Sequence, residues 1–498
     1  MIVLNNVAVQ HLRPGRPPVA ALADVTVRLC ADEKVAVFGA NGSGKSTLLR
    51  VMAGLQRPAR GSVSIFGYEA SSSELPVELR RRIGFVFQNP EDVFAAETVA
   101  EEIRFALECQ RSGSAVADVE VQEALARAGL AHLAGRPLVQ LSGGEKQNVA
   151  LCSALAAQPE IIFFDEPTSY LDPPARRAFL NHSVFTEDDE RRTTLLVTQY
   201  WEEAVRCRRV LVLESGRIVY DGAPSGYTSS GDATSGPELP LDQQWLVTVA
   251  APTSNPLVLV EQLTQTTPVF PGELTNPLGD LSFDILPGER VGLVGPTGAG
   301  KTTLAYHLAG LMPKYQGRIT VAGQAVDAAA ARRRRPPVAM VFQNPEHHLF
   351  AETVAQDVAF GPRNIGFPKS QIDAHVEQSL KLAGLPPAEF GGCSPFEISA
   401  GEQRKAALAG TLALPASLYI FDEPTAYLDL DSVVRMEGIL RALSAAGKAV
   451  LVIAHDLPFL RRVCPRWMVL DRGRLIYDGL LDVLEQDPAP LRSIGFFP

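Results

Sequence analysis

Two stretches of the 498-residue sequence have the residue types and spacing of a loop that binds phosphate. They read GANGSGKS at Gly39–Ser46 and GPTGAGKT at Gly295–Thr302. Glycines let the backbone curl around an anion and present its N–H groups, the lysine reaches the β- and γ-phosphates, and the hydroxyl that follows binds Mg²⁺. A helix is expected after each loop, with its positive N-terminal end toward the same anion. The sequence therefore predicts two nucleotide sites, one in each half of the chain.

Eight residues of each loop are expected to contact nucleotide. In the first half they are Gly39, Asn41, Gly42, Ser43, Gly44, Lys45, Ser46 and Thr47. In the second half they are Gly295, Thr297, Gly298, Ala299, Gly300, Lys301, Thr302 and Thr303. Ser46 and Thr302 are the hydroxyl residues expected to bind Mg²⁺.

An Asp-Glu pair follows a continuous apolar run in each half, in IIFFDEP at Ile161–Pro167 and LYIFDEP at Leu418–Pro424. Such runs are typical of strands buried on both faces. At the end of a buried strand, an aspartate suits Mg²⁺ coordination through water, and the next glutamate suits polarisation of an attacking water. Asp165 and Asp422 are thus predicted metal residues, and Glu166 and Glu423 predicted catalytic residues.

Short β-branched runs alternate with helical stretches, which favours two α/β domains with mainly parallel sheets. Strands are predicted directly before both loops, at 35–38 and 291–294, and further central strands at 195–198 and 450–454. The repeated tails GRIVYDG and GRLIYDG indicate a terminal hairpin in each half. A Ser-, Gly- and Pro-rich stretch separates the halves and is expected to be a flexible linker. The predicted domains are residues 1–222 and 257–498, with the linker at 223–256.

The bulk composition excludes several classes of protein. The net charge of −10 argues against nucleic acid as a partner. The six cysteines are scattered without a C-x-x-C pair, so disulfides and a zinc site are not expected. No apolar run reaches the ~18 residues of a membrane span, and the N-terminus lacks the pattern of a secretory signal. We expect a soluble chain, which other subunits must hold in place if it works at a membrane.

The order of motifs resembles the ATPase subunits of ABC transporters over nearly the whole chain, twice. The order is phosphate loop, FQNP, SGGE or SAGE, FDEPT, YLD and a final Gln or His after a strand. The resemblance implies two P-loop NTPase domains, each with an antiparallel β subdomain and a helical subdomain, that bind and hydrolyse ATP with Mg²⁺. It implies that Gln88 and Gln343 sense the metal and the lytic water, that Asp172 and Asp429 cross the interface between domains, and that His455 is the switch histidine. The signature residues that would contact the γ-phosphate on the opposite domain are Ser142, Gly143, Gly144 and Glu145, and Ser399, Ala400, Gly401 and Glu402.

A narrower resemblance is to the ATPases of energy-coupling factor (ECF) transporters. The segments FVFQNPEDVFAAETVAEEIRFALE and MVFQNPEHHLFAETVAQDVAFGPRNIG are similar to the Q-loop and following helix of those proteins. The resemblance implies uptake of a vitamin or transition-metal ion, with a transmembrane coupling subunit and a substrate-binding membrane subunit as partners. The transported substrate cannot be inferred from this chain.

The family resemblance implies that each ATP site is formed by both domains, which face each other head to tail, with the phosphate loop of one domain opposite the signature motif of the other. Site one then joins Lys45, Glu166 and Gln199 to Ser399–Glu402, whereas site two joins Lys301, Glu423 and His455 to Ser142–Glu145. Both main departures from the family pattern fall in site one. Gln199 is a neutral amide that cannot become a cation as an imidazole can, and Ala400 adds a methyl group where backbone approaches phosphate. We therefore predict that site two is the more active, with Gln199 a weaker substitute for histidine.

Three other classes remain open at this stage. A sugar importer's tandem ATPase would have a similar length, although Lys301 and Thr302 are intact here. A non-transport tandem ABC protein that acts on the ribosome usually has a long charged helical linker, which is absent between the halves. A DNA-repair or chromosome ATPase of the superfamily would need long coiled-coil insertions.

Overall fold

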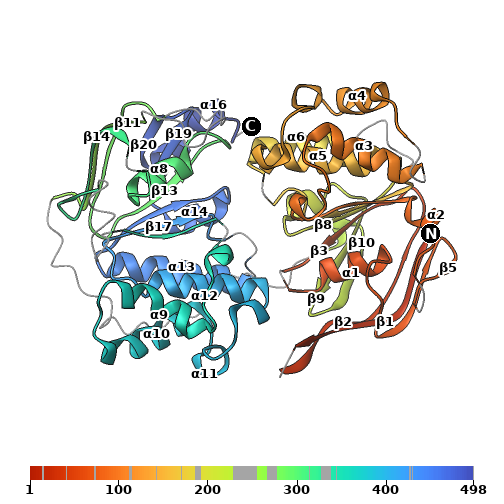
Figure 1. The fold of residues 1–498 in the computed structure, drawn as a ribbon, viewed down its shortest axis with the longest axis horizontal. Coiled ribbons are helices and arrows are strands. Elements are labelled where there is room, and N and C mark those ends of the chain that lie inside the picture. The colour runs from red at the N-terminus through yellow and green to blue at the C-terminus, as the bar shows by residue number, and fades with distance from the viewer. Residues whose placement is uncertain are drawn as a thin grey trace. The chain divides into compact units, whose positions relative to one another are not determined.

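The computed structural model describes most of the chain, in two compact units, Met1–Asp232 and Ala233–Pro498 (Figure 1). The described residues are 1–13, 16–40, 42–71, 74–111, 115–141, 143–156, 158–169, 171–185, 192–227, 255–265, 278–312, 314–326, 338–343, 345–425, 428 and 430–496. Side chains are not described at 11–13, 16–19, 92, 182–183, 346–347, 400 and 430–431. Within the described part, no helix is long and apolar enough to span a bilayer.

The first unit is built on a six-stranded sheet with the order β10-β9-β3-β8-β7-β6. Its strands are β3 (Lys34–Phe38), β6 (Ile83–Val86), β7 (Ile161–Asp165), β8 (Thr193–Thr198), β9 (Arg209–Glu214) and β10 (Arg217–Gly222). All neighbours run parallel except the hairpin of β9 and β10. Because the carboxyl ends of parallel strands meet at one edge, the loops that follow β3, β7 and β8 gather there.

Alternating side chains of the central strands feed two separate apolar clusters. Val35, Val37 and Phe163 pack on one face against helix α1 (Lys45–Met52) and a second, antiparallel sheet. That sheet has the order β2-β1-β4-β5, with strands β1 (Ile2–Arg13), β2 (Arg16–Leu29), β4 (Arg60–Ile65) and β5 (Tyr68–Glu69). Ala36 and Phe164 face the other side, where α6 (Pro173–Phe179) and α7 (Trp201–Ala204) lie. The main sheet is therefore buried on both faces.

A helical part follows the β6 strand and has an apolar cluster of its own. It holds α3 (Val99–Gln110), α4 (Asp118–Arg127) and α5 (Gly143–Ala156), which pack on one another. Thr98 and Glu101 form a capping box that fixes the start of α3. A short helix α2 (Val77–Arg80) precedes β6, and α6 continues into a π-helical turn at Leu180–Val184.

The second unit repeats this plan. Its six-stranded sheet has the order β16-β17-β18-β13-β19-β20 and its antiparallel sheet the order β12-β11-β14-β15. The strands are β11 (Val258–Gln265), β12 (Leu281–Ile285), β13 (Arg290–Val294), β14 (Tyr315–Val321), β15 (Gln324–Ala325), β16 (Val338–Val341), β17 (Leu418–Asp422), β18 (Ala449–Ile453), β19 (Arg466–Asp471) and β20 (Arg474–Leu480). The helices are α8 (Lys301–Leu308), α9 (Val354–Asn364), α10 (Lys369–Ala383), α11 (Pro387–Phe390), α12 (Ala400–Leu412), α13 (Leu430–Ala445), α14 (Leu457–Val463), α15 (Leu481–Gln486) and α16 (Ala489–Ser493).

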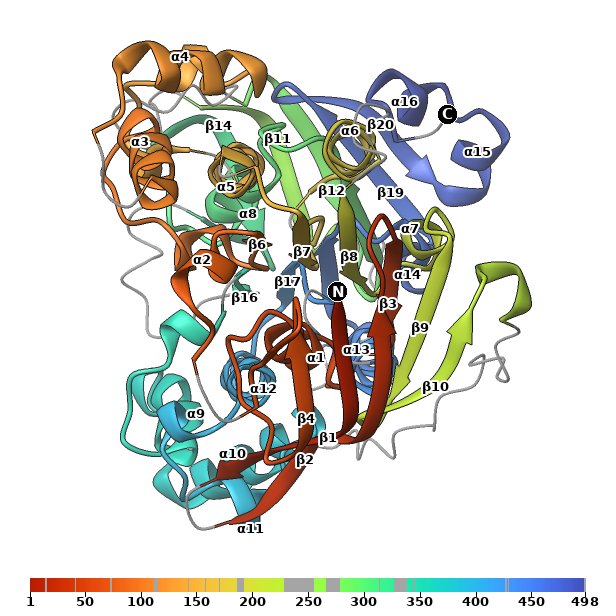
Figure 2. The ribbon, with the colours of Figure 1, turned by 90° about the vertical axis from the view of Figure 1, so that its right-hand side faces the viewer.

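The predicted fold class is confirmed: each unit has a mainly parallel sheet, an antiparallel sheet and a helical part (Figure 2). The strands predicted before the two phosphate loops are β3 and β13, and the two predicted tails form the hairpins of β9 with β10 and β19 with β20. Most of the predicted linker, residues 228–254, lies outside the described residues. The stretch at 223–227 is described, and the ring of Tyr227 lies 5.3 Å from that of Trp201.

Candidate active sites

The first phosphate loop joins β3 to α1 in a conformation that requires glycine. Gly44 has φ of 101°, a left-handed conformation, and a Cβ atom there would lie 2.3 Å from the carbonyl oxygen of Ala21. A Cβ atom at Gly39 would lie 2.3 Å from the carbonyl oxygen of Leu213. Both positions are therefore closed to other residues, and the loop passes close to the neighbouring backbone. Gly300 repeats the left-handed cap before α8, with φ of 101°.

The loop lysines are held by the loops themselves. Lys45 Nζ donates to the carbonyl oxygens of Gly39 at 2.9 Å and of Ala40 at 3.0 Å. Lys301 Nζ donates in the same way to Gly295 at 2.7 Å and to Pro296 at 3.0 Å. Both lysines are buried, so each ammonium group is fixed inside its loop, where a phosphate would neutralise it.

Each loop hydroxyl bonds to the aspartate at the end of the adjacent strand. Ser46 Oγ donates to Asp165 at 2.8 Å, and Thr302 Oγ1 donates to Asp422 at 3.0 Å. Burial raises the pKa of both aspartates to about 6. A hydroxyl and a poorly solvated carboxylate side by side are hard oxygen donors, which fit a shared Mg²⁺ ion. Burial disfavours the negative charge of these carboxylates, and a bound Mg²⁺ ion would stabilise that charge.

In the first unit, the candidate catalytic glutamate lies among three polar side chains. Glu166 Oε1 is 3.3 Å from Lys45 Nζ. Glu166 Oε2 accepts hydrogen bonds from Gln88 Nε2 and from Ser169 Oγ, both at 3.2 Å. The predicted residues Lys45, Gln88 and Glu166 therefore meet in one place. Ser169 was not predicted, although its place directly after the FDEPT motif could have pointed to it.

In the second unit, the corresponding glutamate lies against the predicted switch histidine. Glu423 Oε1 is 3.5 Å from His455 Nε2, and Glu423 Oε2 accepts the backbone N–H of His455 at 3.3 Å. Burial, with the neighbouring Asp422 acting in the same direction, raises the pKa of Glu423 to about 8. In its ionised form, a carboxylate with a raised pKa is a stronger base than an ordinary glutamate.

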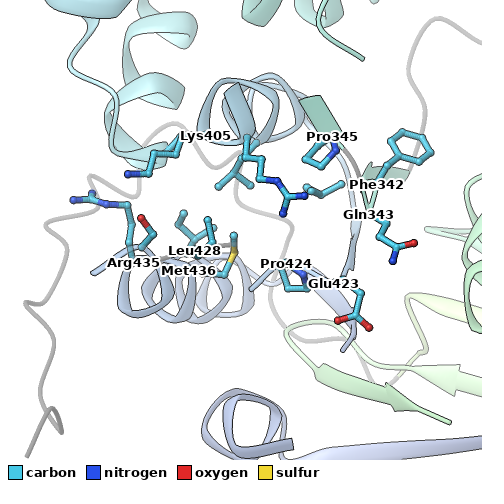
Figure 3. Close-up of a pocket in the computed structure, with 15 residues that line it drawn as sticks. Phe342, Gln343, Pro345, Lys405, Glu423, Pro424, Leu428, Arg435 and Met436 are labelled. Carbon is cyan, nitrogen blue, oxygen red and sulfur yellow. The ribbon is translucent and has the colours of Figure 1, made fainter. Parts of the chain in front are cut away.

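Gln343 and Glu423 both line a pocket in the second unit (Figure 3). Gln343 and Glu423 lie at one end of the view, and Lys405 and Arg435 lie at the other. Pro424, Leu428 and Met436 form part of the apolar wall between them. The pocket therefore joins the predicted Q-loop and Asp-Glu segment to helices α12 and α13.

The two signature motifs each open a helix. In the second unit, Ser399 caps α12: its Oγ accepts the N–H of Glu402 at 3.4 Å, and Glu402 accepts the N–H of Ser399 at 2.7 Å. This capping box leaves Gly401 in the first turn, at the positive end of the helix. In the first unit, α5 begins at Gly143, and Glu145 lies 3.4 Å from Arg136.

Some predicted residues lie outside what the structure describes. Asn41, Ser142 and Asp429 are among these, and the side chain of Ala400 is not described. Gln199 is half-buried directly after β8. It is two residues after Val197, the partner of Asp165, as His455 is two residues after Ile453, the partner of Asp422. Asp172 caps α6 by accepting the N–H of Ala175 at 2.8 Å. The assignment of individual residues to catalysis stays a prediction.

These folds and loops define a class of protein, a tandem P-loop nucleotide hydrolase. A family model described as ABC transporter matches residues 22–169 and 278–426, more than half of the chain. The chain belongs to the ABC transporter family, with two ATPase domains in tandem. ABC ATPases hydrolyse ATP, which they bind with Mg²⁺.

Known proteins with similarity over both halves support the same family. A "Putative ABC transporter ATP-binding protein" of Bifidobacterium longum is 34% identical over 90% of this chain, which spans 62% of that relative. The chain thus covers less than two thirds of that protein's length. A "Putative HMP/thiamine import ATP-binding protein" of Bacillus subtilis is 29% identical, over 92% of this chain and 88% of the relative.

A solved structure also matches nearly the whole chain. It is an archaeal ribosome recycling factor in complex with an archaeal ribosomal stalk protein. The TM-score is 0.62 with 22% identity, covering 98% of this chain and 92% of that one. At this level of identity the match shows the tandem fold alone.

Proposed function

We propose that this chain is the ATPase subunit of an ECF-type importer that takes up a vitamin or a transition-metal ion. A transmembrane coupling subunit would hold it at the cytoplasmic face of the membrane, and a separate membrane subunit would bind the substrate. Closure of the two domains on ATP and their reopening after hydrolysis would drive these partners.

The chemistry proposed for each site follows from the geometry within each unit. Bound Mg²⁺–ATP supplies the electrophilic phosphorus and the metal's charge. Lys301 would bind the phosphates, and Thr302 and Asp422 would hold the metal. Glu423 would accept a proton from the water that attacks the γ-phosphorus, with ADP as the leaving group, while His455 would orient that water. Lys45, Ser46, Asp165 and Glu166 take the same roles in the first unit, with Gln199 in place of the histidine.

We further propose that site two carries most of the turnover. His455 lies next to its glutamate, and an imidazole there can carry a positive charge as the γ-phosphate leaves. Site one would pair Gln199 with the Ala400 signature, and both changes would weaken contacts to the γ-phosphate. This division of labour requires that the two domains close head to tail, as the family resemblance implies.

An exposed phenylalanine at the same place in both units supports the proposal of a membrane partner. Phe105 on α3 and Phe360 on α9 occupy matching positions, 18 residues after the Phe of FQNP in each half, and are 48% and 47% exposed. In the second unit, the exposed Phe350 packs edge-on against Phe360, with ring centroids 4.7 Å apart. Large apolar side chains exposed at the same place in both units indicate a docking surface.

The segment that leads into each of these helices is fixed in the same way. Glu102 accepts the N–H groups of Ala95 and Ala96 at 2.9 and 3.1 Å. Asp357 accepts those of Phe350 and Ala351 at 3.0 and 2.8 Å. In each unit this hydrogen-bonded segment connects the glutamine, Gln88 or Gln343, to the helix. A partner bound to the exposed phenylalanines would therefore contact a segment that leads to the candidate site. The import role named for the Bacillus subtilis relative supports the same class of function.

Co-purification from membranes tests the proposal. The wild-type chain should recover small polytopic membrane proteins, and a Phe105→Ser, Phe360→Ser variant should lose them while it still binds ATP. Val219→Ser is the matched control, because Val219 is 52% exposed on β10, away from the helical part. Recovery of ribosomes without any membrane protein would overturn the importer assignment.

A further inference from the structure

A carboxylate is buried directly behind the candidate site of the first unit. Glu203, on the short helix α7, is only 3% exposed. It accepts a hydrogen bond from Thr168 Oγ1 at 2.7 Å and another from Thr198 Oγ1 at 2.6 Å. A buried carboxylate is costly unless it is well bonded, so these two hydroxyls stabilise it where it is.

The two threonines belong to different segments of the site. Thr198 ends β8 and directly precedes Gln199, and its Oγ1 also accepts the N–H of Tyr200 at 3.0 Å. Thr168 directly precedes Ser169, which donates to Glu166. Through two hydrogen bonds, Glu203 thus joins the segment that carries Gln199 to the segment that carries the candidate catalytic glutamate.

A third segment reaches the same carboxylate. Arg176 on α6 has its Nε 3.7 Å from Glu203 Oε1, and its guanidinium lies 3.7 Å from the ring centroid of Tyr200. This arginine is four residues after Asp172, the N-cap of α6. A cation that both faces a carboxylate and stacks on an aromatic ring keeps its orientation. The start of α6 is therefore tied to the same cluster.

The second unit has apolar side chains at three of the four matching positions, and the fourth, Thr425, keeps the threonine of Thr168. Counted from His455, Ala454 stands for Thr198 and Phe459 for Glu203; counted from Asp429, Val433 stands for Arg176. Ala454 and Phe459 are fully buried in the unit's main apolar cluster, and Val433 packs against it. The two units thus hold the same segments together by different means, a polar cluster in one and apolar packing in the other.

We propose that Glu203 is a positioning residue of the first ATP site, which fixes the Gln199 segment relative to Glu166 through Thr198 and Thr168. The inference rests on the proposed roles of Glu166 and Gln199. Gln199 cannot carry the charge of a histidine, so its contact with a γ-phosphate depends on an accurate position, and Glu203 supplies that position.

Hydrogen exchange tests the positioning directly. In Glu203→Gln, the amide nitrogen cannot accept a hydrogen bond, so one threonine loses its partner. Exchange in the full chain should then rise about fivefold in peptides that cover 166–169 and 198–201, and stay unchanged in α1. Thr198→Val should give the same pattern. The exposed neighbour Glu202→Gln is the control. Exchange equal to that of the control in both segments would overturn the proposal.

Kinetics in a Glu423→Gln background, where turnover is left to site one, give the second readout. Glu203→Gln should lower kcat about fivefold with the KM for ATP unchanged, because the phosphate loop is untouched. The loss should shrink when Gln199→Ala is also present, since both changes act on one contact. An unchanged kcat, or an equal loss in the Gln199→Ala background, would refute the role. If Glu423→Gln alone abolishes turnover, site one does not hydrolyse ATP, and the exchange pattern still decides for or against Glu203.

Discussion

The carboxylate of Glu423 lies 3.5 Å from Nε2 of His455 and also accepts the backbone N–H of that residue. In the first unit, the equivalent Glu166 lies 3.3 Å from Lys45 and bonds to Gln88 and Ser169. The two units share a fold and a motif order, but their candidate bases have different immediate partners. This difference lies inside each unit and does not depend on how the units meet.

His455→Gln should lower kcat for ATP about tenfold or more with little change in KM, because an orienting group for the water and γ-phosphate is lost. Gln199→Ala should lower kcat less, since site one contributes less turnover. Steady-state ATPase assays of both variants provide the comparison. A larger loss from Gln199→Ala than from His455→Gln would reverse the proposed assignment.

Asp422→Asn should stabilise the nucleotide-free protein at pH 7.5. The folded-state pKa of Asp422, about 6, is above the ordinary value of 3.8, so its contribution to stability falls as pH rises from about 4 to 6. Removing the charge should raise the free energy of unfolding at pH 7.5 by the order of 2 kcal/mol, and by less at pH 5. Denaturant titrations at the two pH values measure this, with the exposed Asp482→Asn as control.

The same variant should lose the added stability that Mg²⁺–ATP gives to the wild-type protein, because the metal loses a carboxylate next to Thr302. Thermal melting with ATP, with and without Mg²⁺, tests this. A variant that keeps the Mg²⁺-dependent shift would argue against Asp422 as the metal residue. A variant that is less stable than wild type at pH 7.5 would contradict the preceding stability prediction.

Gly44→Ala should be much more damaging than Gly42→Ala. Both residues have positive φ, 101° and 78°, so both substitutions bring backbone strain of about 1–2 kcal/mol. Only at Gly44 would the new Cβ meet backbone, 2.3 Å from the carbonyl oxygen of Ala21, whereas nothing lies within 4 Å at Gly42. We expect a lower melting temperature and weaker ATP binding for Gly44→Ala, measured by calorimetry. Equal effects would show that close packing of the loop does not matter.

Much of the fold could be predicted because the strands are short, apolar and bounded by motifs. The run Ile161–Phe164 shows burial on both faces in its composition alone, and it forms the first four residues of β7. The ends of strands were harder to predict from the sequence. A strand was predicted at 195–198, but β8 begins at Thr193, because that threonine continues the parallel ladder by pairing with Ile161. Such pairing depends on a partner far away in the sequence.

The residues of the candidate site were likewise only partly predictable from the sequence. Ser46 and Asp165 could be assigned from their motifs, and their side chains meet at 2.8 Å. Glu203 could not, because a Glu-Glu pair after a strand resembles an exposed helix start, and only tertiary packing buries the second of the two. Its role depends on two hydroxyls from separate segments, which the local sequence does not connect.

The most direct measurement of the central claim compares Glu423→Gln with Glu166→Gln in the complex assembled with its membrane partners. Each substitution removes a proton acceptor and keeps the size of the side chain. We predict that Glu423→Gln abolishes most of the ATPase activity, whereas Glu166→Gln retains the larger part of it. An equal loss of activity from the two substitutions would contradict the division of labour between the sites.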